Sequence, residues 1–218
     1  MKKILALWMV LTVAILCCAC GGKEDDADKQ EATESYPVTY TLSPDAQGDQ
    51  KIDATSLNAA KKVLEARLAG TGTEYSVALD EKTKQFTVTC MSNLENDLLT
   101  RKGVVAFVHP VTGMPVINNS DIKSAEVQYD DKKKEHYALI IFTDEGKTKF
   151  KDLTRSSVGK STEVYIDSEM ICAPTVYAPI TDGKVEIHGD FTEQKAVTVA
   201  NLLNCDAMPF ALTITDSN

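Results

Sequence analysis

Residues 189–204 read Gly-Asp-Phe-Thr-Glu-Gln-Lys-Ala-Val-Thr-Val-Ala-Asn-Leu-Leu-Asn, and this stretch decides how the chain folds. Thr192 is a good N-cap, because its hydroxyl can accept a hydrogen bond from a free amide of the first helical turn. Phe191 precedes this cap and Ala196 is the fourth helical residue, which are the two positions of a hydrophobic staple. Apolar residues then recur at helical spacing until Pro209 prevents any continuation. The stretch predicts a helix that docks on a sheet and is followed by a strand.

The residues upstream predict a split βαβ arrangement. The expected elements are a strand at 36–42, a helix ending at Gly70, strands at 75–79 and 85–91, a short helix before Gly103 and a strand at 104–109. This order is typical of ferredoxin-like units, so we assign residues 36–110 to a ferredoxin-like base. A second α+β segment, with a hairpin at 124–142 and a helix capped by Thr143, is expected over 111–206. Residues 207–218 form a final strand and the C-terminal tail.

The N-terminus has the pattern of an export signal over residues 1–19. Lys2-Lys3 precedes an apolar run of about 16 residues, which is short of the roughly 20 needed to span a bilayer. Ala19-Cys20-Gly21-Gly22 is similar to a bacterial lipoprotein processing site, which makes Cys20 the expected lipid acceptor. Two or more acyl chains there would anchor the protein stably. Cys17 stands where such sites usually carry Leu, so ordinary signal cleavage and secretion is the alternative.

Residues 20–35 are expected to form a disordered acidic tether, because charged side chains dominate and no aliphatic residue larger than Ala is present. Removal of residues 1–19 takes away Lys2 and Lys3 and no acid, so the net charge changes from −9 to −9 − 2 = −11. Phosphate neutralisation needs positive charge, which excludes nucleic acid as a partner. No polybasic patch is left for an anionic membrane surface, so the lipid on Cys20 is the expected contact with the bilayer.

No residue pattern predicts catalysis, a cofactor or a metal. Ser157-Val158-Gly159-Lys160 matches the Ser-x-x-Lys of penicillin-recognising enzymes, but their Lys-Thr-Gly and Ser-x-Asn partners are missing. The three histidines lack the spacing of metal ligands. Cys90, Cys172 and Cys205 are an odd set in an exported chain, so at least one is a free thiol unless it pairs between molecules. A bridge between Cys172 and Cys205 is one alternative, and three separate thiols are the other.

A series of short motifs resembles, in order, the first large extracytoplasmic domain of SecD and SecDF. The matching segments are Phe142-Thr143-Asp144-Glu145-Gly146, Phe150, Leu153-Thr154, Gly159-Lys160, Tyr165-Ile166-Asp167, Cys172-Ala173-Pro174, Gly189-Asp190-Phe191-Thr192 and Ala207-Met208-Pro209. Val116–Val127 and the helix that contains Arg67 also fit. The resemblance covers about residues 36–215. It implies an α+β fold, namely a ferredoxin-like base with an inserted α+β head subdomain.

This chain departs from the family pattern in two ways. Asp206 stands where the family has Gly, which predicts a positive φ at the end of the helix and a stabilising effect of Asp206→Gly. The family continues into transmembrane helices after this domain, whereas this sequence stops at Asn218. A proton-driven cycle needs ionisable groups inside the membrane, so we expect no such cycle from this chain by itself.

The processing-site pattern and this resemblance together lead us to expect a non-enzymatic lipoprotein, anchored through Cys20 on the extracytoplasmic face of the cell membrane. Its head is expected to bind unfolded or emerging polypeptide, or a Sec translocation component, in protein export. The residues assigned to polypeptide binding are Cys172, Ala173, Pro174, Thr175, Val176 and Tyr177. Short strands around them and the 124–142 hairpin offer backbone groups for strand addition. The alternative is an adaptor or solute-binding envelope lipoprotein that reuses the fold.

Overall fold

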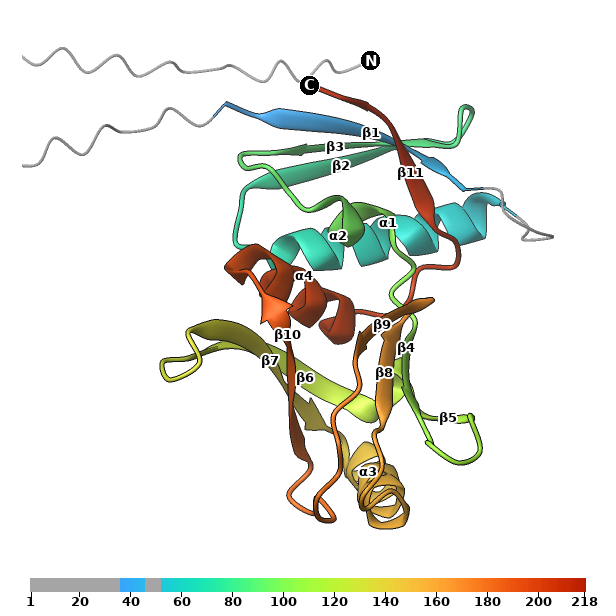
Figure 1. Ribbon diagram of the computed structural model, residues 1–218. Coiled ribbons are helices and arrows are strands. Elements are labelled where there is room, and N and C mark those ends of the chain that lie inside the picture. The colour runs from blue at the N-terminus through green and yellow to red at the C-terminus, as the bar shows by residue number, and fades with distance from the viewer. Residues whose placement is uncertain (1–35, 46–51) are drawn as a thin grey trace, which may run out of the picture. The chain divides into compact units, whose positions relative to one another are not determined.

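The computed structural model describes residues 36–45 and 52–218, which build two hydrophobic cores. One core belongs to the base and the other to the head, drawn above and below the helix α4 in Figure 1. The predicted export signal, Cys20 and the acidic tether lie outside the described residues. No helix in the described part of the chain is long and apolar enough to cross a membrane.

The base is a four-stranded antiparallel sheet in the order β11-β1-β3-β2, with α1 and α2 on one side of it (Figure 1). Its elements are β1 (Val38–Pro44), α1 (Ala54–Ala69), β2 (Tyr75–Asp80), β3 (Gln85–Cys90), α2 (Asn96–Thr100) and β11 (Leu212–Ser217). The Asp53 carboxylate begins α1 by accepting a hydrogen bond from the Ser56 amide at 3.0 Å. Leu64 of α1 and Leu99 of α2 join Phe86 of β3 in the core. This is the expected ferredoxin-like arrangement.

One strand of the predicted base is misplaced. The strand expected at 104–109 forms as β4 (Val105–Val108), but β4 pairs with β5 and β8 and belongs to a different sheet. The vacant position in the base sheet is filled by β11, which pairs with β1. Val105 and Phe107 are buried, whereas Ala106 and Val108 are only partly buried. This alternation is compatible with a strand in the base sheet or in the head sheet. The chain therefore leaves the base directly after α2 and returns to it for the last strand.

The head contains two antiparallel sheets, in the orders β10-β7-β6 and β5-β4-β8-β9. Its remaining elements are β5 (Pro115–Ile117), the 3-10 turn η1 (Asn119–Asp121), β6 (Ile122–Asp130), β7 (Glu135–Phe142), α3 (Asp144–Ser156), β8 (Glu163–Ile166), β9 (Glu169–Cys172) and β10 (Lys184–Phe191). The ring centroids of Phe107, Phe142 and Phe150 lie 4.6 to 5.8 Å from one another where the sheets meet α3. Such aromatic contacts stabilise the junction beyond the area that they bury.

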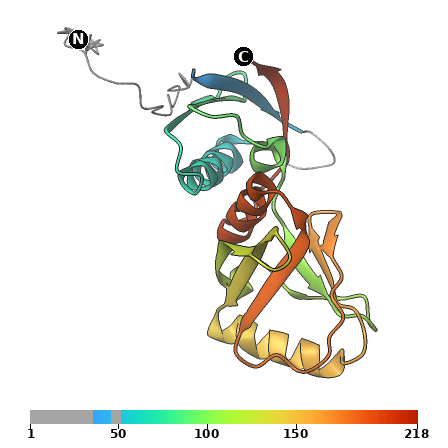
Figure 2. The same cartoon turned by 60° about the vertical axis from the view of Figure 1, so that its left-hand side comes forward.

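The helix α4 (Glu193–Asn204) lies between head and base (Figures 1 and 2). Thr192 caps it as predicted, because its hydroxyl accepts from the Lys195 amide at 3.1 Å. The apolar side of α4 packs on β6 and β7 of the head. Towards the base, the Lys195 ammonium contacts the Asp97 carboxylate of α2 at 2.7 Å. Extended backbone at Cys205 ends the helix, and Asp206 is not among the residues with positive φ, so that prediction was wrong.

A buried arginine fixes the crossing from base to head. The Arg67 side chain is fully buried, and its guanidinium donates to the carbonyl oxygens of Leu98 at 3.1 Å, Arg101 at 2.6 Å and Lys102 at 2.7 Å. Burial lowers the pKa of Arg67 to about 10, which still leaves it charged at neutral pH. A Cβ at Gly103 would lie 2.6 Å from Arg67 Nη2, and Gly103 has φ +79°, so glycine is required there.

Candidate polypeptide-binding groove

A groove of about 750 Å³ opens in the head between β10 and the segment 174–180. The residues that line it are Phe107, Leu139, Phe150, Thr154, Thr162, Val164, Pro174, Thr175, Val176, Tyr177, Ala178, Pro179, Ile180, Asp182, Lys184, Val185, Glu186 and Ile187. Most are apolar. Phe107 and Phe150 belong to the aromatic junction, so the floor of the groove is part of the folded core of the head.

The wall formed by 174–180 is held by its own backbone hydrogen bonds. The Pro174 carbonyl accepts from the Thr162 amide at 3.0 Å. Val176 donates to the Lys160 carbonyl at 2.9 Å and accepts from the Gly159 amide at 2.8 Å. These bonds join the wall to the segment that connects α3 to β8. The wall is therefore ordered although it contains no regular strand.

The opposite wall is the edge strand β10, which pairs with β7 alone among residues 36–45 and 52–218. Four consecutive residues of β10, Lys184 to Ile187, line the groove. Successive residues of a strand point to opposite faces of the sheet. Residues of both faces of β10 contact the groove, so it includes the edge of this strand, and Leu139 of the neighbouring strand β7 extends the lining beyond that edge.

The groove also contains buried hydroxyl groups. The Thr154 hydroxyl accepts from the Ile180 amide at 3.0 Å and donates to the Phe150 carbonyl at 2.9 Å, which secures the end of the 174–180 wall. Thr162 is 3% exposed, and its hydroxyl has no partner among the described residues. A buried hydroxyl without a partner is costly, so Thr162 presents an unused hydrogen-bonding group in an otherwise apolar groove.

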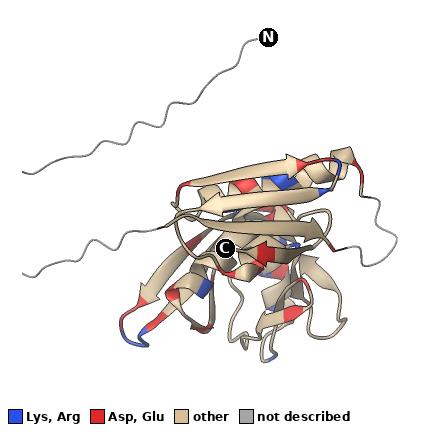
Figure 3. Ribbon diagram, turned by 90° about the horizontal axis from the view of Figure 1, so that it is seen from above, with Lys and Arg blue, Asp and Glu red and all other residues tan. Residues whose placement is uncertain are grey.

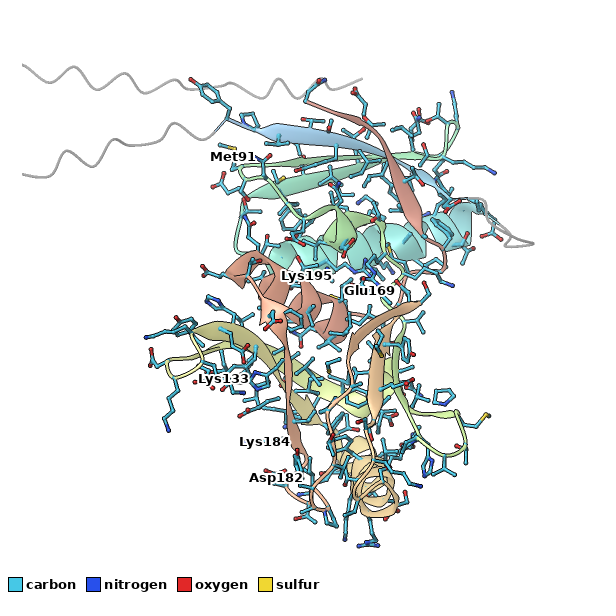
Figure 4. All side chains as sticks on the ribbon, viewed as in Figure 1. Met91, Lys133, Glu169, Asp182, Lys184 and Lys195 are labelled. Atoms are coloured by element: carbon cyan, nitrogen blue, oxygen red, sulfur yellow. The ribbon has the colours of Figure 1, made fainter. Side chains whose placement is uncertain are left out.

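Charged residues lie at the rim of the groove. Asp182 and Lys184 are neighbours at the end of β10 that is distant from the base (Figure 4), and the Asp182 carboxylate accepts from the Lys184 backbone amide at 3.2 Å. The Glu186 carboxylate contacts His188 Nε2 at 3.1 Å. Figure 3 shows acidic and basic residues distributed over both base and head. The interior of the groove is apolar and its rim is of mixed charge.

The structure brings together four of the six residues assigned to polypeptide binding from the sequence. Pro174, Thr175, Val176 and Tyr177 line the groove, whereas Cys172 and Ala173 are not among its lining residues. Val176 is buried, and the Tyr177 side chain is 86% exposed at the rim. Cys172 packs against the core of the head.

Sequence reasoning missed the other wall and the floor. The sequence analysis assigned no binding role to Lys184–His188, because alternation does not reveal which strand lies at an edge. The 124–142 hairpin, expected to offer an edge for strand addition, forms β6 and β7. β7 is the central strand of its sheet and β6 is an edge strand remote from the groove lining. The edge beside the groove is that of β10.

The cysteines form no disulfide in the described part of the chain, where Cys90, Cys172 and Cys205 are free thiols. Burial raises the pKa of Cys172 to about 11, because it disfavours the thiolate. The disulfide between Cys172 and Cys205, one of the two alternatives from the sequence, is not formed, because both residues are free thiols. No group of three His, Cys, Asp or Glu side chains within residues 36–45 and 52–218 is placed to hold a metal ion.

These features define a protein with a ferredoxin-like base and an inserted α+β head that carries an apolar groove beside an open strand edge. Residues 97–210 match the family model described as the SecDF P1 head subdomain, and the chain belongs to this family.

Relatives and solved structures agree with this assignment. SecD, a protein translocase subunit of Sebaldella termitidis, is 35% identical over 105 residues, which are 48% of this chain and 26% of that protein. SecDF of Thermus thermophilus is 27% identical over 173 residues, which are 78% of this chain and 22% of that protein. A solved structure described as a membrane component SecDF that enhances protein export superposes with a TM-score of 0.63 at 20% identity, over 82% of this chain and 98% of that one. The chain spans about a quarter of the length of these curated relatives.

Proposed function

We propose that the head binds extended, unfolded polypeptide in its groove during protein export, without catalysis and without a cofactor. The observation that carries this proposal is an apolar groove that runs along an unpaired strand edge. An unfolded chain exposes apolar side chains and unpaired backbone groups, and a folded protein hides both. The apolar lining of the groove would contact the apolar side chains, and the edge of β10 would pair with the backbone groups. The groove would therefore bind an unfolded chain in preference to a folded one.

Family membership supports the export role. The relatives are named as subunits of the protein translocase, and one solved relative is described as enhancing protein export. A component of the Sec machinery is therefore the protein partner that we propose, next to the polypeptide itself.

A lipid on Cys20 would hold this head on the extracytoplasmic face of the cell membrane. A fully extended tether of 15 residues, 21–35, reaches at most about 50 Å. The groove would then stay close to the surface from which exported chains emerge. The net charge of −9 for the whole sequence would favour encounters with basic segments, and salt would weaken that attraction.

A solute-binding lipoprotein is the second candidate, because a volume of about 750 Å³ falls within the usual range of small-molecule sites, about 300–1,000 Å³. An enclosed solute would need convergent polar groups for orientation. The groove offers chiefly the Thr162 hydroxyl and backbone groups of β10, which suit a peptide better.

The test is a titration of the purified protein with a fluorescently labelled substrate, once reduced and unfolded and once folded. We expect binding of the unfolded form only. Tyr177→Ser should weaken it about ten-fold, as truncation of an aromatic contact does. Val111→Ser is the matched control, because Val111 is also exposed, at 61%, but does not line the groove. Equal binding of both forms, or equal effects of the two substitutions, would contradict the proposal and favour the solute-binding alternative.

A further inference from the structure

The outer edge of β10 is a short, defined set of backbone groups. The Phe142 amide donates to the Gly183 carbonyl at 3.0 Å, which makes Phe142 and Gly183 a hydrogen-bonded pair of the β7–β10 ladder. Hydrogen-bonded and non-hydrogen-bonded pairs alternate in an antiparallel ladder. Lys184 and Glu186, which oppose Ile141 and Leu139, are therefore non-hydrogen-bonded positions. Their amides and carbonyls point away from β7.

One hydrogen bond and one bulge limit the outer edge of β10 on its two sides. At one end the Asp182 carboxylate already accepts from the outward Lys184 amide at 3.2 Å. At the other end the pairing with β7 is interrupted between Ile187 and Phe191, where Asp190 has φ +52°. Such a bulge bends the strand and disrupts regular pairing locally, and pairing resumes where Phe191 opposes His136. In the part of β10 that lines the groove, the outward groups without a partner among the described residues are the Lys184 carbonyl and the amide and carbonyl of Glu186.

The facing wall offers few free backbone groups for pairing with this edge. Pro174 and Pro179 have no amide to donate, and the backbone groups of Val176 are bonded to Gly159 and Lys160. Proline cannot donate to a strand ladder, so these two positions of the wall cannot complete regular pairing with β10. Among the described residues no segment pairs with the outer edge of β10, and the Thr162 hydroxyl in the same groove has no partner there either.

We propose that the groove binds its polypeptide by strand addition to β10, with the amide and carbonyl of Glu186 as the central contact. The inference rests on the proposed function and names how the substrate is recognised. Because the part of the edge that lines the groove offers outward backbone groups at Lys184 and Glu186, a short extended segment fills it. Recognition by backbone groups is independent of sequence, which suits a site that handles many exported chains.

The test compares Glu186→Pro with Glu186→Ala in the purified protein. Both substitutions remove the carboxylate and its contact with His188, but only proline removes the outward amide. The Glu186 amide points away from β7, so proline is compatible with the existing pairing. The probe is a labelled, extended apolar peptide with basic ends, followed by fluorescence anisotropy. We expect Glu186→Pro to bind about ten-fold more weakly than Glu186→Ala, because the two variants differ at this edge by one hydrogen-bond donor.

A second measurement keeps the test valid if Glu186→Pro does not fold. In the unsubstituted protein, saturating peptide should slow hydrogen exchange of the Glu186 amide about ten-fold or more. The Val185 and Ile187 amides, which face β7, should change far less. Peptide that binds without protecting the Glu186 amide would overturn strand addition while leaving the proposed function intact. A protein that binds no unfolded polypeptide at all would overturn both.

Discussion

Substitution of Gly70 by Ala should loosen the contact between base and head. Gly70 ends α1 with φ −69° and ψ −14°, a helical conformation in which alanine is normally preferred by about 0.5–1 kcal/mol. Here a Cβ would lie 1.7 Å from Asn201 Oδ1 and 2.8 Å from its Cγ. Asn201 belongs to α4, is 6% exposed, and donates through Nδ2 to the Val197 carbonyl at 3.0 Å. It therefore has little freedom to move.

Helix propensity and steric overlap change the free energy of unfolding in opposite directions, and the net effect is the difference between them. Overpacking of a buried contact costs about 1–3 kcal/mol, and the upper end applies because the overlap is severe. After the gain in helix propensity is subtracted, Gly70→Ala should lower the free energy of unfolding by about 2 kcal/mol. In an Asn201→Ala background the overlap is absent. The same substitution should then raise the free energy of unfolding by about 0.5 kcal/mol.

A double-mutant cycle measured by urea denaturation would test this reasoning, with circular dichroism as the probe. The expected coupling energy between Gly70→Ala and Asn201→Ala is about 2.5 kcal/mol, within the range known for residues in contact. Asn201→Ala alone should cost about 1 kcal/mol for the lost hydrogen bond. Additive effects of the two substitutions, or a stabilised Gly70→Ala single variant, would show that α1 and α4 do not approach each other as described.

Three further outcomes are expected. With a pKa of about 11, the Cys172 thiol should react with iodoacetamide at pH 8 about a hundred-fold more slowly in the folded than in the unfolded chain. Because burial raises this pKa in the folded state, the stability that the protonated thiol contributes should be lost as pH rises from 9 through 11. Cys172→Ala should abolish this loss. Lys134 has φ +59°, so Lys134→Gly should raise the free energy of unfolding by about 1 kcal/mol, whereas Asp206→Gly, at a position without positive φ, should lower it in thermal melts. A fatty-acid analogue should label the protein in cells but not its Cys20→Ala variant, and equal labelling of both would remove the proposed anchor.

The sequence alone determined the local features and the family. Thr192 and Thr143 cap their helices as predicted, because a cap depends on a hydroxyl and an amide only three residues apart. The ordered motifs pointed to the SecDF head, which the family match confirms. Pro174 to Tyr177, which the sequence analysis expected to bind polypeptide, line the groove, and their binding of polypeptide stays a prediction.

Only the tertiary structure decided which strands are neighbours. Alternation of apolar residues places a side chain on a face of a sheet but says nothing about which strand lies alongside. The strand over 104–109 could therefore be assigned to the base although it pairs within the head. For the same reason the open edge at Glu186 could not be foreseen, because an edge is defined by a partner that is missing. The φ of Asp206 likewise depends on the extended backbone of Cys205, through which the chain returns from α4 to the base. Tertiary contacts determine this conformation, and the local sequence does not reveal it.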